Sequence, residues 1–141
     1  MPILNYTTQV DSFKTLNEIQ KILSRAGARK VIIDSNEKGL PVALTFALEW
    51  NGLLTAFTLP CNFEGVLRAM KKDCSVPSKY CNEEQALRVG WRIVKVWIEA
   101  QMAIIESQLV TAPEVFLPYA VTKYGTTMYK HLDSDNTLLV R

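Results

Sequence analysis

The sequence predicts an α+β domain in which an antiparallel sheet of three to four strands packs on helices, one of them long, C-terminal and largely buried. A hairpin signal, a long helical repeat of hydrophobic residues and a globular composition predict this class. The chain has 141 residues, the usual size of one domain, with 48% hydrophobic and 21% charged residues. We expect residues 1–141 to form one domain, with a loosely ordered tail at 131–141.

The hairpin is predicted by residues 42–50 and 53–59, which flank the dipeptide Asn51-Gly52. Both residues of a type I′ turn need a positive φ, which Asn and Gly adopt readily. Such a turn places the larger hydrophobic side chains on one face of the hairpin. The expected core face comprises Leu44, Phe46, Leu48, Trp50, Leu53, Thr55, Phe57 and Leu59.

The N-terminal segment predicts a helix between two extended stretches. Residues 1–10 are expected to form a short strand or an arm, and residues 30–34 a strand of the sheet. Thr15 and Glu18 have the spacing of a capping box, which predicts that the helix begins there. Gly27 then ends the helix.

Two helices are expected after the hairpin. Asn62 caps a short one that ends near Lys72, and Asn82 with Gln85 forms a second capping box that opens a helix reaching about Val110. The polar residues of this long helix fall on one narrow stripe, and nearly all its other residues are hydrophobic. A helix of this kind is buried in its own domain or in an oligomer, so we expect a homo-oligomer.

The C-terminal region gives weaker signals. Prolines interrupt residues 113–118, so we expect no regular structure there. A hairpin turning at Lys123-Tyr124-Gly125, with a strand at 126–129, precedes the loose tail.

Composition narrows the function classes. A net charge of +2 is too small for a protein that coats nucleic acid by charge alone. The N-terminus lacks a secretory signal, and charged residues interrupt the longest hydrophobic stretch, so we expect a cytoplasmic protein without a membrane span. Three cysteines without CxxC spacing and a single histidine, His131, predict free thiols and neither a metal nor a cofactor.

The best candidate site is a row of cations, Arg88, Arg92 and Lys95, on the long helix. Spacings of four and three place them on one side, about one turn apart, where they would hold phosphates of a nucleotide or a nucleic-acid backbone. The alternative is a solvated face. Tyr80 and Tyr124, in looser segments, are the aromatic residues we expect at a ligand.

Two further basic groups follow helix ends, where the helix dipole favours cations. They comprise Arg25, Arg29 and Lys30, and Arg68, Lys71 and Lys72. The second group lies at the C-terminal end of its helix, whereas a double-stranded-RNA-binding domain needs lysines at the N-terminal end of its second helix. The helix–strand–strand–strand–helix order therefore does not predict that module.

Catalytic signatures are missing from the sequence. There is no Gly-rich phosphate loop, no His-Glu-x-x-His pair and no base for a nucleophile. We expect a protein that is not an enzyme. The alternative is a small nucleotide-acting enzyme with Asp34, Glu49 or Glu99 as its acid–base group.

The run from Glu84 to Gln101, EQALRVGWRIVKVWIEAQ, resembles a family of small accessory proteins of tailed phages and prophages. Residues 15–20, Leu59-Pro60 and residues 114–119 share this resemblance, which covers residues 3 to about 130. The family has no settled activity, so no functional residue carries over. One departure is Val96, where family members often carry an acidic residue, and it enlarges the hydrophobic face of this helix.

The resemblance implies a phage accessory, and such a protein without catalytic groups works by binding. We therefore expect a counter-defence protein that sequesters an anionic nucleotide signal or occludes a host defence effector. The alternative is a nucleic-acid-binding accessory of phage replication or recombination.

Overall fold

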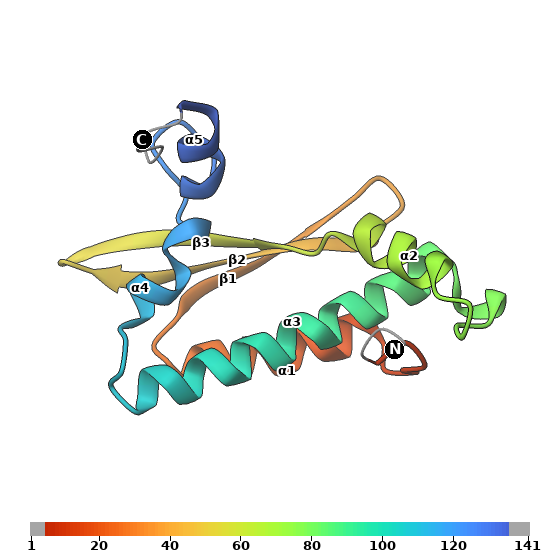
Figure 1. The fold of residues 1–141 in the computed structure, drawn as a ribbon. Coiled ribbons are helices and arrows are strands. Elements are labelled where there is room, and N and C mark those ends of the chain that lie inside the picture. The colour runs from red at the N-terminus through yellow and green to blue at the C-terminus, as the bar shows by residue number, and fades with distance from the viewer. Residues whose placement is uncertain (1–4, 136–141) are drawn as a thin grey trace, which may run out of the picture.

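The computed structural model describes residues 5–135 and shows a three-stranded antiparallel sheet with two helices on one face (Figure 1). The strand order is β1-β2-β3. The predicted α+β class, with a long and largely buried helix, is confirmed. The elements are α1 (Ser12–Arg25), β1 (Arg29–Ser35), β2 (Pro41–Trp50), β3 (Leu53–Pro60), α2 (Phe63–Lys72), η1 (Ser78–Tyr80), α3 (Glu83–Glu106), α4 (Ala112–Phe116), η2 (Leu117–Tyr119) and α5 (Met128–Asp135).

The β2–β3 hairpin has the predicted register. Trp50 pairs with Leu53 and Phe46 with Phe57, and the turn residues Asn51 and Gly52 have φ angles of 53° and 79°. The predicted core face is buried except near the turn, because the hairpin extends beyond the helices that cover it. Leu53, predicted to be a core residue, is 72% exposed.

Helices α1 and α3 run side by side in the same direction beneath the sheet (Figure 1). The predicted start of α1 is wrong: the helix begins at Ser12, and the Asp11 side chain accepts a hydrogen bond from the Phe13 N–H at 3.1 Å. Residues 5–10 contain no strand, and residues 1–4 lie outside the described part of the chain.

The second predicted capping box is half present. Asn82 Oδ1 accepts from the Gln85 N–H at 2.9 Å. The Gln85 amide, however, donates to the carbonyls of Tyr6 and Thr8 at 3.0 and 2.9 Å. The buried Gln85 side chain therefore fixes the N-terminal segment to α3. Helix α3 ends at Glu106, short of the predicted end at Val110.

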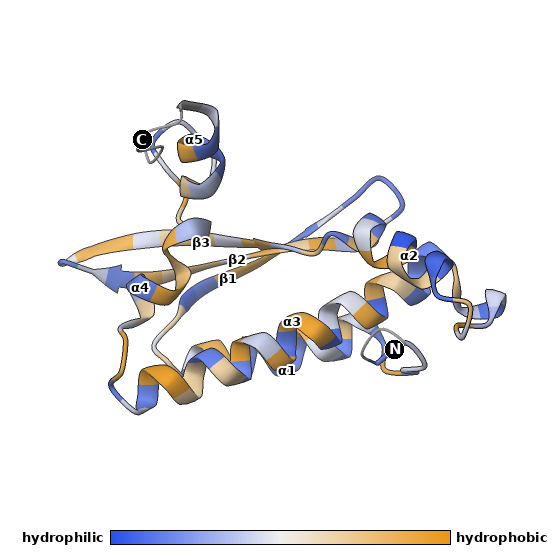
Figure 2. Ribbon diagram, viewed as in Figure 1, coloured by the Kyte–Doolittle hydropathy of each residue, from blue (hydrophilic) through white to orange (hydrophobic). Residues whose placement is uncertain are grey.

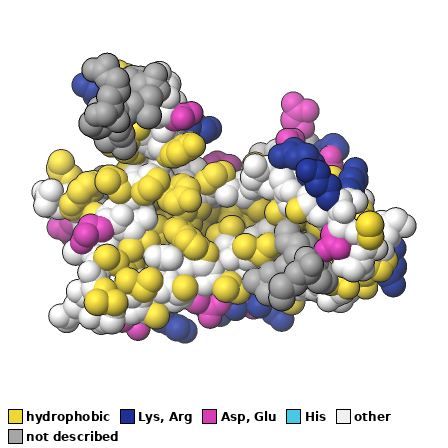
Figure 3. Space-filling view, in the orientation of Figure 1, with side chains coloured by type: hydrophobic (Ala, Val, Ile, Leu, Met, Phe, Trp, Pro, Cys, Tyr) yellow, Lys and Arg dark blue, Asp and Glu magenta, His cyan; other side chains and the backbone are white. Residues whose placement is uncertain are grey.

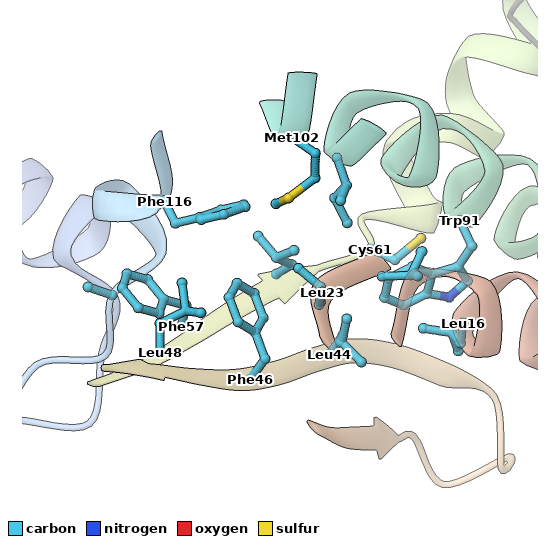
Figure 4. Close-up of a cluster of buried hydrophobic side chains, with 14 of the residues drawn as sticks. Leu16, Leu23, Leu44, Phe46, Leu48, Phe57, Cys61, Trp91, Met102 and Phe116 are labelled. Atoms are coloured by element: carbon cyan, nitrogen blue, oxygen red, sulfur yellow. The ribbon is translucent and has the colours of Figure 1, made fainter. Parts of the chain in front are cut away.

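The core lies between the sheet and the two helices (Figure 4). The aromatic rings of Phe46, Phe57 and Phe116 meet with centroids 5.3–6.2 Å apart. Trp91 is fully buried, and its Nε1–H donates to the Pro41 carbonyl at 3.0 Å. Hydrophobic residues follow the strands and the inner sides of the helices, whereas the β1–β2 loop is hydrophilic (Figure 2).

The C-terminal region departs most from the predictions. Thr111 and Glu114 form a reciprocal capping box that opens α4, where a proline is tolerated in the first turn. The expected C-terminal hairpin is reduced to one bridge, between Val121 and Thr127. Helix α5 replaces the strand predicted at 126–129 and the start of the predicted loose tail. The tail residues 136–141 lie outside the described part of the chain.

Within residues 5–135, no helix combines the length and the hydrophobicity that crossing a membrane requires.

Candidate functional site

The cations of the predicted site lie along the side of α3 that meets α1. Arg92 Nη1 is 3.0 Å from Glu18 Oε2, and Lys95 Nζ is 2.8 Å from the same oxygen. Arg92 also donates to the Thr15 hydroxyl at 3.4 Å. Glu18 therefore occupies the position between two cations that the sequence assigned to a ligand anion.

The two ends of the row also have carboxylate partners. Arg88 Nη1 donates to Gln85 Oε1 at 2.9 Å, and its Nη2 lies 3.8 Å from Glu84 Oε2. Lys95 lies 3.9 Å from Glu99 Oε1. Every cation of the row thus has a carboxylate within ion-pair distance, and an incoming phosphate must displace one.

Glu18 is held in its ionised form. The hydrogen bond from Lys95 contributes most to lowering the pKa of this carboxyl, and Arg92 adds to the effect against the opposing cost of partial burial. The side chains of Glu18, Arg92 and Lys95 are 31%, 23% and 18% exposed. This geometry is that of an interhelical ion-pair network that fixes α1 against α3.

Two concavities near the row are unsuited to an anion. A cleft of about 70 Å³ beside Arg88 is lined also by Asp11 and Glu84, and it is smaller than the 300–1,000 Å³ typical of ligand pockets. An open notch of about 590 Å³ contains Glu83 and Glu84, and its one cation, Lys38, pairs with Glu83 at 3.0 Å. Carboxylates on these walls repel phosphate.

The predicted aromatic residues lie elsewhere. Tyr80 lies in η1, within the connection between α2 and α3, and its ring makes a T-shaped contact with Tyr6 with the ring centroids 5.7 Å apart. Tyr124 is 67% exposed and stacks on His131 at 5.7 Å, in the segment between η2 and α5. The structure thus gathers Arg88, Arg92 and Lys95 into one row but does not bring Tyr80 or Tyr124 to it.

The basic group of α2 does not converge with the row. Helix α2 packs on the flank of α3 that carries Ala86 and Val89, around the helix from the cations. Its own cations, Arg68, Lys71 and Lys72, are exposed, and none has a carboxylate within 4.0 Å among the described residues.

The acid–base candidates are dispersed. Asp34 pairs with Ala43 in β1–β2, and Glu49 pairs with Leu54 at the other end of the sheet. Glu99 projects from α3 toward Lys95. Burial raises the pKa of the Cys61 thiol to about 12, which keeps it in the protonated form that is a poor nucleophile.

Sequence reasoning missed an apolar end of the molecule. Its members are exposed leucines from the β2–β3 turn, the α3–α4 loop and η2. The turn and the loop both lie at the end of the molecule where α3 stops (Figure 1). The leucines are Leu53 (72% exposed), Leu54 (45%), Leu109 (76%) and Leu117 (38%). Hydrophobic side chains gather in the middle of this face and lie among acidic and other side chains at this end, while Lys and Arg gather over α2 (Figure 3). The exposure of Leu53 and Leu54 follows from a hairpin that extends beyond the helices covering it.

Comparison with known proteins gives no further assignment, because no protein-family model, curated protein or solved structure matches the chain.

Proposed function

We propose that this protein is a non-catalytic, cytoplasmic counter-defence protein that binds a host defence effector and occludes it. The apolar end formed by Leu53, Leu54, Leu109 and Leu117 is the observation that carries this proposal. The resemblance of the chain to phage accessory proteins supplies the biological setting.

The apolar end has the character of a protein-binding surface. Single exposed hydrophobic residues are ordinary, whereas four exposed leucines at one end of the molecule favour an interaction site there. Leu53 and Leu54 are neighbours in β3, so they present this hydrophobic surface on both faces of the hairpin tip. Leu53 and Leu109 are both more than two-thirds exposed, so each leaves most of a hydrophobic side chain in water. Covering them with a partner recovers free energy that folding alone does not.

Occlusion of an effector is favoured over sequestration of a nucleotide. Sequestration needs free cations around a concavity, whereas Arg92 and Lys95 already share Glu18 and the cleft at Arg88 is about 70 Å³. We expect titration calorimetry with cyclic oligonucleotides and ADP-ribose derivatives to give no saturable heat.

The test is the plating efficiency of a restricted phage on host strains that each carry one defence system. Wild-type protein should restore plating on the strain whose effector it binds. The Leu53→Asp/Leu109→Asp variant should fail, because two interface leucines at about 2 kcal/mol each weaken binding roughly 1,000-fold.

The matched control adds the same charge to the exposed side of α1. Asn17→Asp/Gln20→Asp should plate like wild type, and thermal unfolding should show both variants folded. Full phage plating on the strain that carries Leu53→Asp/Leu109→Asp would contradict the proposal.

Nucleic-acid binding is the second candidate, and the exposed cations Arg68, Lys71 and Lys72 of α2 favour it. Its signature would be affinity for DNA that falls steeply with salt, by about 0.7–0.9 log units per phosphate contact for each log unit of salt. The net charge of +2 makes it the lesser candidate.

A further inference from the structure

The two edges of the sheet differ in what the rest of the chain does with them. On the β3 edge, Ala120 forms a bridge with Phe57, and the Val121 N–H donates to the Ala56 carbonyl at 2.8 Å. On the other edge, β1 pairs with β2 alone, and no other described residue forms a hydrogen bond with residues 29–35. The β1 edge therefore carries backbone donors and acceptors that have no partner in the described part of the chain.

Alternation along the sheet identifies which groups of β1 point outward. The Cys61 N–H donates to the Val42 carbonyl at 2.8 Å, so the residues of β2 that share the direction of Val42 face β3. The intervening residues of β2 face β1, where they pair with Ile32 and Asp34. Ile33 lies between these two and therefore directs its N–H and its carbonyl away from the sheet.

The charges of β1 are distributed unevenly along the strand. Arg29 and Lys30 stand at its beginning and Asp34 near its end, and all three are exposed. None of them has an opposite charge within 4.0 Å among the described residues. Between them, Ile32 is 55% exposed. The strand is therefore basic at its start, hydrophobic in the middle and acidic toward its end.

We propose that β1 pairs with β1 of a second copy of this chain, antiparallel across a two-fold axis at Ile32, so that the two sheets become continuous. In this register Lys30 of each chain faces Asp34 of the other, and the two Ile32 side chains face each other. A parallel arrangement would place like charges side by side, which is unfavourable. A two-fold axis requires a surface that matches itself on reversal, and the charge order of β1 meets this requirement.

The backbone fits the same register. The Val31 carbonyl points outward because it belongs to the same planar peptide as the Ile32 N–H, which points toward β2. The outward Ile33 N–H of each chain can therefore donate to the Val31 carbonyl of the other. Shifting the axis to Ile33 would place Ile32 opposite Asp34, and shifting it to Asp34 would place two carboxylates opposite each other.

The pairing is short. The register between β1 and β2 shifts on both sides of Ile32–Asp34, so the ladder between two copies cannot extend far beyond this stretch. We therefore expect a dimer whose population rises with protein concentration. This dimer gives a surface to the homo-oligomer expected from the sequence, and it depends neither on the apolar end nor on the proposed function.

Sedimentation velocity over a range of protein concentrations tests the pairing through its charges. Wild-type protein should shift from the mass of one chain toward twice that mass as the concentration rises. Lys30→Glu and Asp34→Lys, each alone, should weaken self-association by about tenfold or more, because two symmetry-related pairs change from attraction to repulsion. An equimolar mixture of the two variants should dimerise again, because each introduced charge then faces its opposite.

The controls change charges outside β1. Lys21→Glu in α1 and Glu64→Lys in α2, both at exposed residues, should self-associate like wild type. Wild-type protein that stays monomeric into the millimolar range would overturn the proposal and show that the charges and bulges of β1 protect its edge. A mixture of Lys30→Glu and Asp34→Lys that stays monomeric, or either variant associating like wild type, would overturn it as well.

Cysteine cross-linking tests the register. In a background with Cys74→Ser and Cys81→Ser, the remaining Cys61 is buried. Ile32→Cys should form a disulfide with its counterpart under mild oxidation, because pairs without hydrogen bonds bring Cα atoms to about 4.5 Å, within the range of a disulfide. Ile33→Cys should not, since Ile33 packs toward the core and would face Val31 of the other chain. Cross-linking of Ile33→Cys, or none by Ile32→Cys, would contradict the proposed register.

Discussion

Replacing Glu18 by Gln is expected to lower the free energy of unfolding by about 2 kcal/mol. Breaking a fully buried ion pair costs about 3–5 kcal/mol, and breaking an exposed one costs about 0–1 kcal/mol. Glu18, 31% exposed and shared by Arg92 and Lys95, lies between these limits. The variant keeps the shape of the side chain but leaves two half-buried cations without their common carboxylate.

The same contact has a pH signature. Because the folded-state pKa of Glu18 is lowered from 4.5, its contribution is present at neutral pH and is lost as the pH falls below about 4.5 through the folded-state value. Wild-type protein should therefore lose its advantage over Glu18→Gln progressively in acid. Above the unfolded pKa, the difference between the two should be constant.

Urea unfolding at several pH values measures both effects. Glu64→Gln, at an exposed carboxylate of α2 that has no ion pair among the described residues, is the control and should change stability little. A Glu18→Gln variant as stable as wild type at neutral pH would show that the network contributes nothing to the α1–α3 contact.

Gly90→Ala is expected to destabilise the protein by about 2 kcal/mol, although alanine is the better helix former. A Cβ at this position would lie 2.6 Å from Cys61 Sγ and 3.6 Å from Val66 Cγ2. Overpacking a buried contact costs about 1–3 kcal/mol, and here it should outweigh the gain of up to about 1 kcal/mol in helix propensity.

The cause can be isolated in a double-mutant cycle measured by urea unfolding. In a Cys61→Ala background the sulfur is gone, so Gly90→Ala should become neutral or stabilising by up to about 1 kcal/mol. The same loss in both backgrounds would show that Cys61 is not what requires glycine here.

The sequence predicts local features of this fold well. Asn51-Gly52 determines the hairpin register because both residues readily take a positive φ, and Asn62 caps α2 through its own side chain. Neither feature depends on distant residues. Pro113 shows the limit of such rules, because it opens α4 in the first turn instead of preventing a helix.

The candidate site was less predictable because its geometry depends on contacts distant in sequence. The spacing of Arg88, Arg92 and Lys95 correctly places them on one side of α3. Their partner Glu18 lies 74 residues before Arg92 in the sequence, and its spacing from Thr15 resembled a capping box. Likewise, the exposure of Leu53 follows from where the covering helices end, which the hairpin alone does not show.

The most direct test of binding through the apolar end is to compare two variants in the same plating assay. Leu53→Asp/Leu109→Asp alters that end, and Arg88→Glu reverses the cation of the row nearest the cleft. We expect the leucine variant to fail to restore phage plating and Arg88→Glu to restore it like wild type. Loss of plating with Arg88→Glu, together with full plating with the leucine variant, would show instead that the protein acts by holding an anion.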